Sequence, residues 1–138
     1  MQKVEIYLET DSIQPASCNR KYGYVLATTY KGELVTREGF GSIEGTYHQA
    51  VLRALCEAFN RICVSCEVTV YSRNAHVMAH LSKIDEMRAA GFKDAKQNEI
   101  KNAEQWMNVS RLAKEHIVGT KYGQHEYTTW LQEEMKKR

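Results

Sequence analysis

Two of the four cysteines stand at a spacing that can bind metal. Cys63 and Cys66 form a Cys-x-x-Cys pair, which is half of a tetrahedral zinc site. No second pair of closely spaced Cys or His residues follows at zinc-finger distance, and Cys56 stands among apolar residues at helical spacing. We therefore expect these residues and Cys18 to be reduced structural thiols that hold no metal.

Basic residues gather in three short segments of a chain that carries little net charge. Nineteen Lys and Arg against seventeen Asp and Glu leave a formal charge of +2, so composition permits a nucleic-acid partner without requiring one. Affinity for phosphate would have to come from a local patch, unless these side chains are only solvated surface charges. The candidates are Arg20 with Lys21, then Lys93, Lys96 and Lys101, and the tail from Lys136 to Arg138.

Histidines and tryptophans are further residues that could take part in binding or catalysis. His76, His80 and His125 could titrate near neutral pH, but such residues are more often surface or hydrogen-bonded core side chains than ligands. Trp106 and Trp130 could stack on nucleic-acid bases, but we expect both rings in the core because of their size. Neither set defines a site by itself.

The composition is that of one folded domain. The chain has 138 residues, 43% of them hydrophobic, with a single proline, which allows about two-thirds of the unfolded surface to be buried. It shows no repeat, linker or low-complexity tract. The first residues lack the apolar centre of a signal peptide, and no apolar run approaches the roughly 20 residues that cross a bilayer. We expect a single domain over residues 1–138, cytoplasmic and without a membrane partner.

The hydrophobic pattern predicts the elements that must position these residues. Residues 4–9 alternate as a strand, and two β-rich runs at 22–30 and 33–40 meet at the turn Lys31-Gly32, so a three-stranded meander is expected. Residues 46–59 carry apolar side chains at helical spacing behind Thr46, a plausible cap. A further strand at 67–72 leads into a helix, and a helix at 82–90 is stopped by Gly91.

The succession of these elements resembles type 1 ribonuclease H. The first two strands are similar to the family's opening hairpin, and the run from Thr46 is similar to its first helix. Arg73-Asn74, followed by Val77, stands where the family has Asp-Ser and then Tyr-Val. Lys101-Asn102-Ala103-Glu104-Gln105-Trp106 resembles the family's Lys-Asn-x-Asp-Leu-Trp at a helix start. The resemblance covers nearly the whole chain in order, which is more specific than any single motif.

The resemblance implies an α/β fold, a mixed five-stranded sheet flanked by helices. The first and fourth strands would be parallel neighbours near its centre, joined by a right-handed crossover. A fifth strand at 116–119 and a closing helix at 125–135 would complete the fold. Ligands in open α/β sheets meet the carboxyl ends of the strands, where Glu9 and Arg73 would lie.

The resemblance also implies a chemistry, the cleavage of RNA in RNA–DNA hybrids by two Mg²⁺ ions held on four carboxylates. This chain keeps one acidic residue of the four, Glu9. The other three positions correspond to Val51, Arg73 and Thr129, and the family's mobile-loop histidine corresponds to Thr120. Because the Arg73 guanidinium stays charged at any working pH, it would repel a cation.

Other acidic residues could restore a displaced site. Asp11 follows Glu9 on the same strand face if the strand runs that far, and Glu126 lies about one helical turn before Thr129. Glu9, Asp11 and Glu126 are therefore the remnant candidates, and Mg²⁺ would be a cofactor only if they act together. Otherwise we expect no cofactor.

Arg73 can be interpreted in two ways. It could pair with Glu9 across adjacent strands, or it could hold a phosphate of a bound nucleic acid. The pair is favoured because it needs no partner. The sequence thus predicts a ribonuclease H-like domain that has lost catalysis and binds nucleic acid, or a protein of a nucleic-acid pathway. The alternatives are an active ribonuclease H with a displaced site and a protein-interaction module on the same scaffold.

Overall fold

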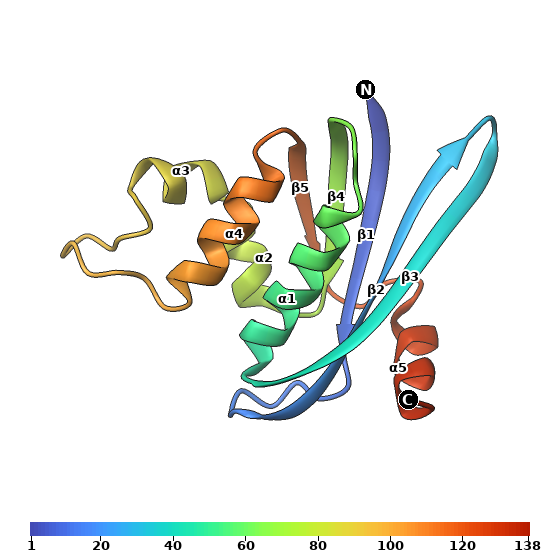
Figure 1. Cartoon of the computed structure of the whole chain (residues 1–138), viewed down its shortest axis with the longest axis horizontal. Helices are drawn as coiled ribbons and strands as arrows, with labels where there is room; N and C mark the ends of the chain where they lie inside the picture. Colours follow the sequence, from blue (N-terminus) through green and yellow to red (C-terminus); the bar gives the residue numbers. More distant parts are fainter.

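A five-stranded mixed sheet forms the centre of the computed structural model, which describes all residues 1–138 (Figure 1). The strand order is β3-β2-β1-β4-β5. β1, β2 and β3 are antiparallel neighbours, whereas β4 runs parallel to both β1 and β5. The expected meander and the parallel pairing of the first and fourth strands are therefore confirmed. The strands are β1 (Gln2–Thr10), β2 (Cys18–Tyr30), β3 (Glu33–Gly45), β4 (Cys66–Ser72) and β5 (Ile117–Tyr122).

Helices cover the two faces of the sheet unequally. Four of them gather on one side, and the closing helix lies alone against the other face (Figure 1). None of the five helices has the length and apolar character needed to cross a bilayer. The helices are α1 (Tyr47–Asn60), α2 (Ala75–Leu81), α3 (Ile84–Ala89), α4 (Ala103–Ala113) and α5 (Thr128–Lys136).

Local hydrogen bonds explain where several of these elements begin. Thr46 and Gln49 form a reciprocal capping box at the start of α1. The predicted cap at Thr46 is therefore confirmed. The closing helix begins at Thr128 rather than at the expected residue 125, because His125 makes a turn with Thr128 that precedes the helix. β5 also runs further than expected, because its pairing with β4 continues to Tyr122.

Alternation along β1 divides the core into two parts. Val4, Ile6 and Leu8 join the larger cluster with α1, α2 and α4, while Tyr7 faces the smaller cluster under α5. Trp106 is buried as expected, but Trp130 is 41% exposed. The expectation for Trp130 was wrong because α5 turns Leu131 and Met135 toward the sheet, which leaves Trp130 at the side of the helix.

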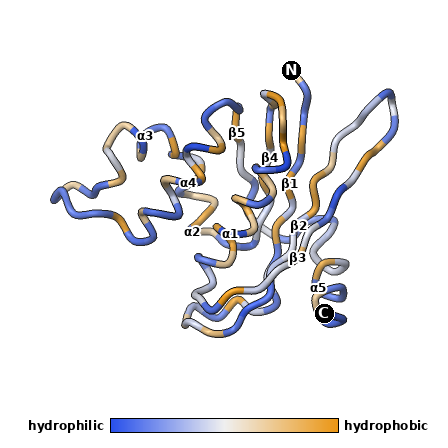
Figure 2. The backbone as a smooth tube through the Cα atoms, in the orientation of Figure 1, coloured by the Kyte–Doolittle hydropathy of each residue, from blue (hydrophilic) through white to orange (hydrophobic).

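The loop between α3 and α4 projects from the body of the domain and is mainly hydrophilic (Figures 1 and 2). It carries Lys93 and Lys96, both exposed, with a single β-bridge between Lys93 and Glu99. Gly91 has a positive φ of 68° and follows α3, where it ends the helix as expected. Two of the basic candidates are therefore presented to solvent on a projecting segment.

Arg20 is fully buried and holds the loop between β1 and β2. Its Nη1 donates to the carbonyl of Ser12 at 2.5 Å, and its Nη2 donates to those of Gln14 and Ala16 at 2.7 and 2.8 Å. The expectation that Arg20 contacts nucleic acid was wrong, because the guanidinium faces backbone carbonyls rather than solvent. Lys21 likewise directs its ammonium to the carbonyls of Met135 and Arg138 at the end of α5.

We predict that Arg20→Met lowers the free energy of unfolding by about 2 to 4 kcal/mol. The substitution removes three hydrogen bonds from a charged donor and leaves carbonyls of the loop without partners. Chemical denaturation would measure the loss, and limited proteolysis should show faster cleavage within residues 11–17. The exposed Arg37→Met is the matched control and should change stability little. Equal effects of the two substitutions would contradict a structural role for Arg20.

Candidate functional site

The parallel strands β1 and β4 bring Glu9 and Arg73 together at their carboxyl ends. Arg73 follows the last residue of β4, and its guanidinium reaches back across to β1. Its Nε donates to Glu9 Oε2 at 2.9 Å and its Nη2 donates to Glu9 Oε1 at 2.7 Å. Two parallel bonds of this kind are the strongest geometry available to an arginine and a carboxylate. The expected pair between the two residues is confirmed.

Burial makes this pair different from a surface ion pair. The Glu9 side chain is 1% exposed and that of Arg73 is 26% exposed. Hydrogen bonding to Glu9 raises the pKa of Arg73, which opposes the lowering caused by burial. Glu9 also accepts a hydrogen bond from the amide of Thr10 at 3.2 Å. Both oxygens of the only acidic residue kept from the four expected positions are thus engaged by protein donors.

The other expected positions are dispersed around this pair. Val51 is buried in the apolar core on α1, with 2% exposure. Thr129 is exposed on α5 and lines an open, polar pocket that also includes Arg73. Thr120 was expected on a mobile loop, but it lies within β5 and pairs with Val70, so that expectation was wrong. The remaining residues of the pocket are Asp11, Ile13, Gln124, Thr128, Gln132, Glu133 and Lys136.

The acidic residues that could have restored a site form no cluster with Glu9 that could hold a metal ion. β1 ends at Thr10, and the Asp11 carboxylate accepts from the amide of Lys21 at 3.1 Å. Glu126 accepts from the Tyr7 hydroxyl at 2.7 Å, on the part of β1 where Tyr7 also bonds Glu5. No three His, Cys, Asp or Glu side chains lie close enough to hold a metal ion. The remnant candidates Glu9, Asp11 and Glu126 therefore do not form the displaced carboxylate cluster that the alternative of an active enzyme requires.

The loop between β5 and α5 lies next to the pair. His125 stands in this loop, and its Nε2 makes a 2.9 Å hydrogen bond with the carbonyl of Leu8, next to Glu9. Burial lowers the pKa of His125, opposed by the bond to Leu8 and by the charge of Glu9. His125 is thus a half-buried, hydrogen-bonded histidine that ties the loop to β1 beside Glu9.

Residues beside Arg73 that the sequence did not single out complete the neighbourhood. Asn74 caps α2 by accepting from the amide of Val77 at 2.9 Å, and its side-chain nitrogen contacts His48 Nδ1 at 2.9 Å. Tyr47 is close enough to feel these charges, and burial, followed by the charge of Glu9, raises its pKa to about 12. The Asn after the strand was the one available signal, because Asn is a preferred helix cap.

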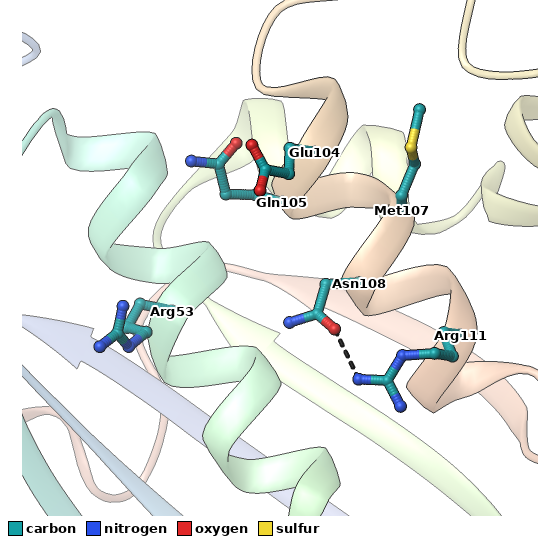
Figure 3. Close-up of a pocket in the computed structure, with 6 residues that line it drawn as sticks. All are labelled: Arg53, Glu104, Gln105, Met107, Asn108 and Arg111. Carbon is teal, nitrogen blue, oxygen red and sulfur yellow. Dashed lines mark hydrogen bonds between the residues drawn. The ribbon is translucent and has the colours of Figure 1, made fainter.

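A second pocket lies between α1 and α4, away from the strand ends (Figure 3). It is lined by polar side chains, and its two arginines are already partnered. Arg111 donates to Asn108 at 2.6 Å, and Arg53 pairs with Glu57 one helical turn away. Since it shares no residue with the strand-end pocket and contains no convergent buried charge, we do not assign chemistry to it. The remaining lining residues are Glu104, Gln105 and Met107.

The cysteines do not form a site in this structure. All four are free thiols, with Cys66 buried at the start of β4 and Cys63 exposed before it. Burial raises the pKa of Cys56 to about 11, so this thiol stays protonated at neutral pH. The structural role expected for these thiols agrees with the burial of Cys66 and the half-buried position of Cys56.

We predict that Glu9 and Arg73 are energetically coupled. Arg73→Ala leaves a buried carboxylate without its counter-charge, and Glu9→Gln leaves the guanidinium unpaired, so each should cost about 3 to 5 kcal/mol of stability, less where water reaches Arg73. The double variant should lose less than the sum, as measured by denaturation in a double-mutant cycle. The exposed Arg53 and Glu57 pair is the control, with coupling of about 0.5 kcal/mol or less. Additive losses for Glu9 and Arg73 would rule out the coupling.

Comparison with known proteins gives matches in both sequence and structure, although no family model matches the chain. The chain is 33% identical over 101 residues to a ribonuclease H of Chromobacterium violaceum, covering 69% of this chain and 65% of that protein. It is 24% identical over 123 residues to a ribonuclease H of Caldicellulosiruptor saccharolyticus, covering 86% and 80%. The chain thus spans about two-thirds of the length of the first of these relatives.

Solved structures share the fold at low sequence identity. LC9-RNase H1, a type 1 enzyme with the type 2 active-site motif, superposes with a TM-score of 0.73 at 14% identity over 99% of this chain and 70% of that one. The N-terminal RNase H domain of a Mycobacterium tuberculosis protein gives 0.68 at 15% identity, covering 95% and 94%. A foamy viral protease-reverse transcriptase in complex with an RNA/DNA hybrid gives 0.60 at 18% identity, covering 88% and 17%. The chain therefore has a ribonuclease H-like fold, and its sequence similarity to two ribonucleases H supports a place in that family.

Proposed function

We propose that this chain is a ribonuclease H-like domain that binds nucleic acid and does not hydrolyse it by the two-metal mechanism. The observation that carries the proposal is the buried bidentate pair of Glu9 and Arg73 at the strand ends. A carboxylate that is 1% exposed needs a compensating charge, and here a guanidinium supplies it from the neighbouring strand. The charge that a bound cation would supply is thus already provided by the protein.

The residues around this pair do not suit two divalent cations. Mg²⁺ takes oxygen ligands in near-octahedral geometry, and a two-metal site needs several carboxylates to offset four positive charges. Val51 offers an alkyl group, Thr129 offers a single hydroxyl, and Arg73 adds positive charge where ligands are needed. We therefore assign no step of chemistry to a metal at this site.

Two observations support nucleic acid as the partner rather than protein alone. The foamy viral protein that shares this fold was solved in complex with an RNA/DNA hybrid. In this chain, exposed lysines stand on the same side as the strand ends. Lys101 is close enough to His48, at the start of α1, for its charge to lower the pKa of that ring. Lys136 lines the pocket beside Arg73. With Lys93 and Lys96 on the projecting loop, these side chains can contact several phosphates of one duplex.

We predict that an RNA–DNA hybrid binds with an affinity that falls steeply with salt and is not cleaved in Mg²⁺ or Mn²⁺. Phosphate contacts dominate because shape and backbone are what such a fold can read in a duplex. In fluorescence anisotropy at several salt concentrations, substituting Lys93, Lys96 and Lys101 together by Gln should reduce the slope of log K against log salt by about 2 to 3.

The control for this measurement is a triple variant at the opposite end of the sheet. Lys3, Lys31 and Lys114 are exposed there, and their substitution by Gln removes the same charge without touching the proposed face. The control should bind like the parent protein. Cleavage of the hybrid by the parent, absent from Glu9→Gln, would overturn the loss of catalysis. A lack of binding even at low salt would favour the protein-interaction module instead.

We further predict that rebuilding the carboxylates makes stability depend on Mg²⁺. The triple variant Val51→Glu, Arg73→Asp and Thr129→Asp removes the guanidinium that neutralises Glu9 and adds three carboxylates at the positions that the family fills with acids, so it should melt below the parent in chelator and gain stability as Mg²⁺ is added. The melting temperature of the parent should not respond to Mg²⁺. A parent response that Glu9→Gln abolishes would show that the natural residues already bind the ion.

A further inference from the structure

Three of the five histidines form one column of neighbouring rings next to the strand-end site. His48 of α1 stacks on His76 of α2, with ring centroids 4.3 Å apart and an interplanar angle of 16°. His76 lies 4.1 Å from His80, one turn further along α2, and His80 lies 5.9 Å from the ring of Trp106 on α4. The column therefore joins α1, α2 and α4, and it adjoins Arg73 through Asn74.

Hydrogen bonds determine what each ring presents. Since the Asn74 side-chain oxygen accepts from the amide of Val77, its nitrogen must donate to His48 Nδ1, so neutral His48 carries its proton on Nε2. His80 Nδ1 can donate to the carbonyl of His76 at 2.8 Å, which leaves Nε2 as an acceptor in the neutral ring. Protonation would convert this acceptor into a charged donor.

The surroundings of the column favour an anion over a cation. Burial is the largest cause that lowers the pKa of both His48 and His76, followed by the positive charges of Lys101 and of neighbouring histidines. Lys101, from the segment before α4, is the charged group that faces the rings from the packed elements, and no carboxylate acts on His48 or His76. A divalent metal would meet this positive charge, and the three rings are not arranged as a group that could hold a metal ion.

We propose that the column of His48, His76 and His80 binds phosphate groups of a nucleic acid when it is protonated, so that affinity for nucleic acid rises as the pH falls below 7. The inference rests on the proposed function and adds its regulation by protons. It assigns to α1 and α2 a phosphate contact that is weak at neutral pH and strong in mildly acidic solution.

The direction of the effect follows from linkage. In the free protein the lowered pKa values of His48 and His76 keep these two rings neutral at pH 7, and an anion that contacts them favours the charged form and raises those pKa values. Binding then takes up protons, and each proton taken up changes affinity by about tenfold per pH unit. Because adjacent charged rings repel one another, we expect about one to two protons rather than three.

The test measures hybrid affinity at pH 5.5, 6.5 and 7.5 at constant ionic strength. The parent should bind at least about tenfold more tightly at the lowest pH than at the highest. The variant with His48, His76 and His80 all replaced by Gln should lose most of that dependence. His116→Gln is the matched control, because His116 bonds the amide of Cys66 at the other end of the sheet, and it should keep the dependence.

A second measurement does not depend on nucleic acid. Sulfate keeps its charge over this pH range, so the histidine proton resonances of the parent should titrate at higher pH in sulfate than in chloride of equal ionic strength. If the triple variant does not fold, His76→Gln takes its place, because this side chain is exposed and caps no helix. That variant should halve the pH effect or more.

The outcomes separate the two proposals. Hybrid binding that does not change with pH, or that changes equally in the column variant, overturns the inference and leaves the proposed function standing. A sulfate response at the column without hybrid binding at any pH overturns the proposed function and keeps the anion site. If neither the pH response nor the sulfate response is observed, the inference is overturned.

Discussion

The pair of Glu9 and Arg73 is the interaction on which the strand-end region depends. A carboxylate at the centre of a sheet, 1% exposed, is costly unless its charge is matched at short range. In this chain the matching charge is the guanidinium of Arg73, and the parallel pairing of β1 with β4 places it next to Glu9. Folding alone therefore satisfies the charge, and no bound ion has to be present for the region to be ordered.

A second buried guanidinium adds to the positive charge at the same end of the sheet. Arg20 lies 5.9 Å from the centre of the Tyr47 ring, and the pKa of Tyr47 responds to Glu9, Arg73 and Arg20 together. Arg73 and Arg20 thus place two guanidinium groups near the single carboxylate of Glu9, while Asp11 and Glu133 line the open pocket above Arg73. The positive groups that face outward on this side are Lys136 in the pocket and Lys101 beside the histidine column.

Regular elements were predictable because their signals are local. The alternation of apolar and polar residues predicted β1 and β4. Thr46 predicted the start of α1, and Gly91 predicted the end of α3. The Glu9 and Arg73 pair was also predictable, because parallel strands place the residues after their ends side by side. What the sequence could not decide was which polar side chains are exposed. Arg20 had the pattern of a surface loop residue, yet the carbonyls it binds come from a loop whose path depends on the whole sheet edge.

Long-range packing decided the rest. The exposure of Trp130 depends on which face α5 turns to the sheet, and the column of His48, His76 and His80 exists only because α1 and α2 pack together.

Paramagnetic broadening by Mn²⁺ in the full chain tests most directly whether Arg73 has replaced the metals. The account predicts that the amide resonances of Glu9, Thr10 and Arg73 stay sharp in millimolar Mn²⁺. Selective broadening of these resonances, lost in Glu9→Gln, would contradict it.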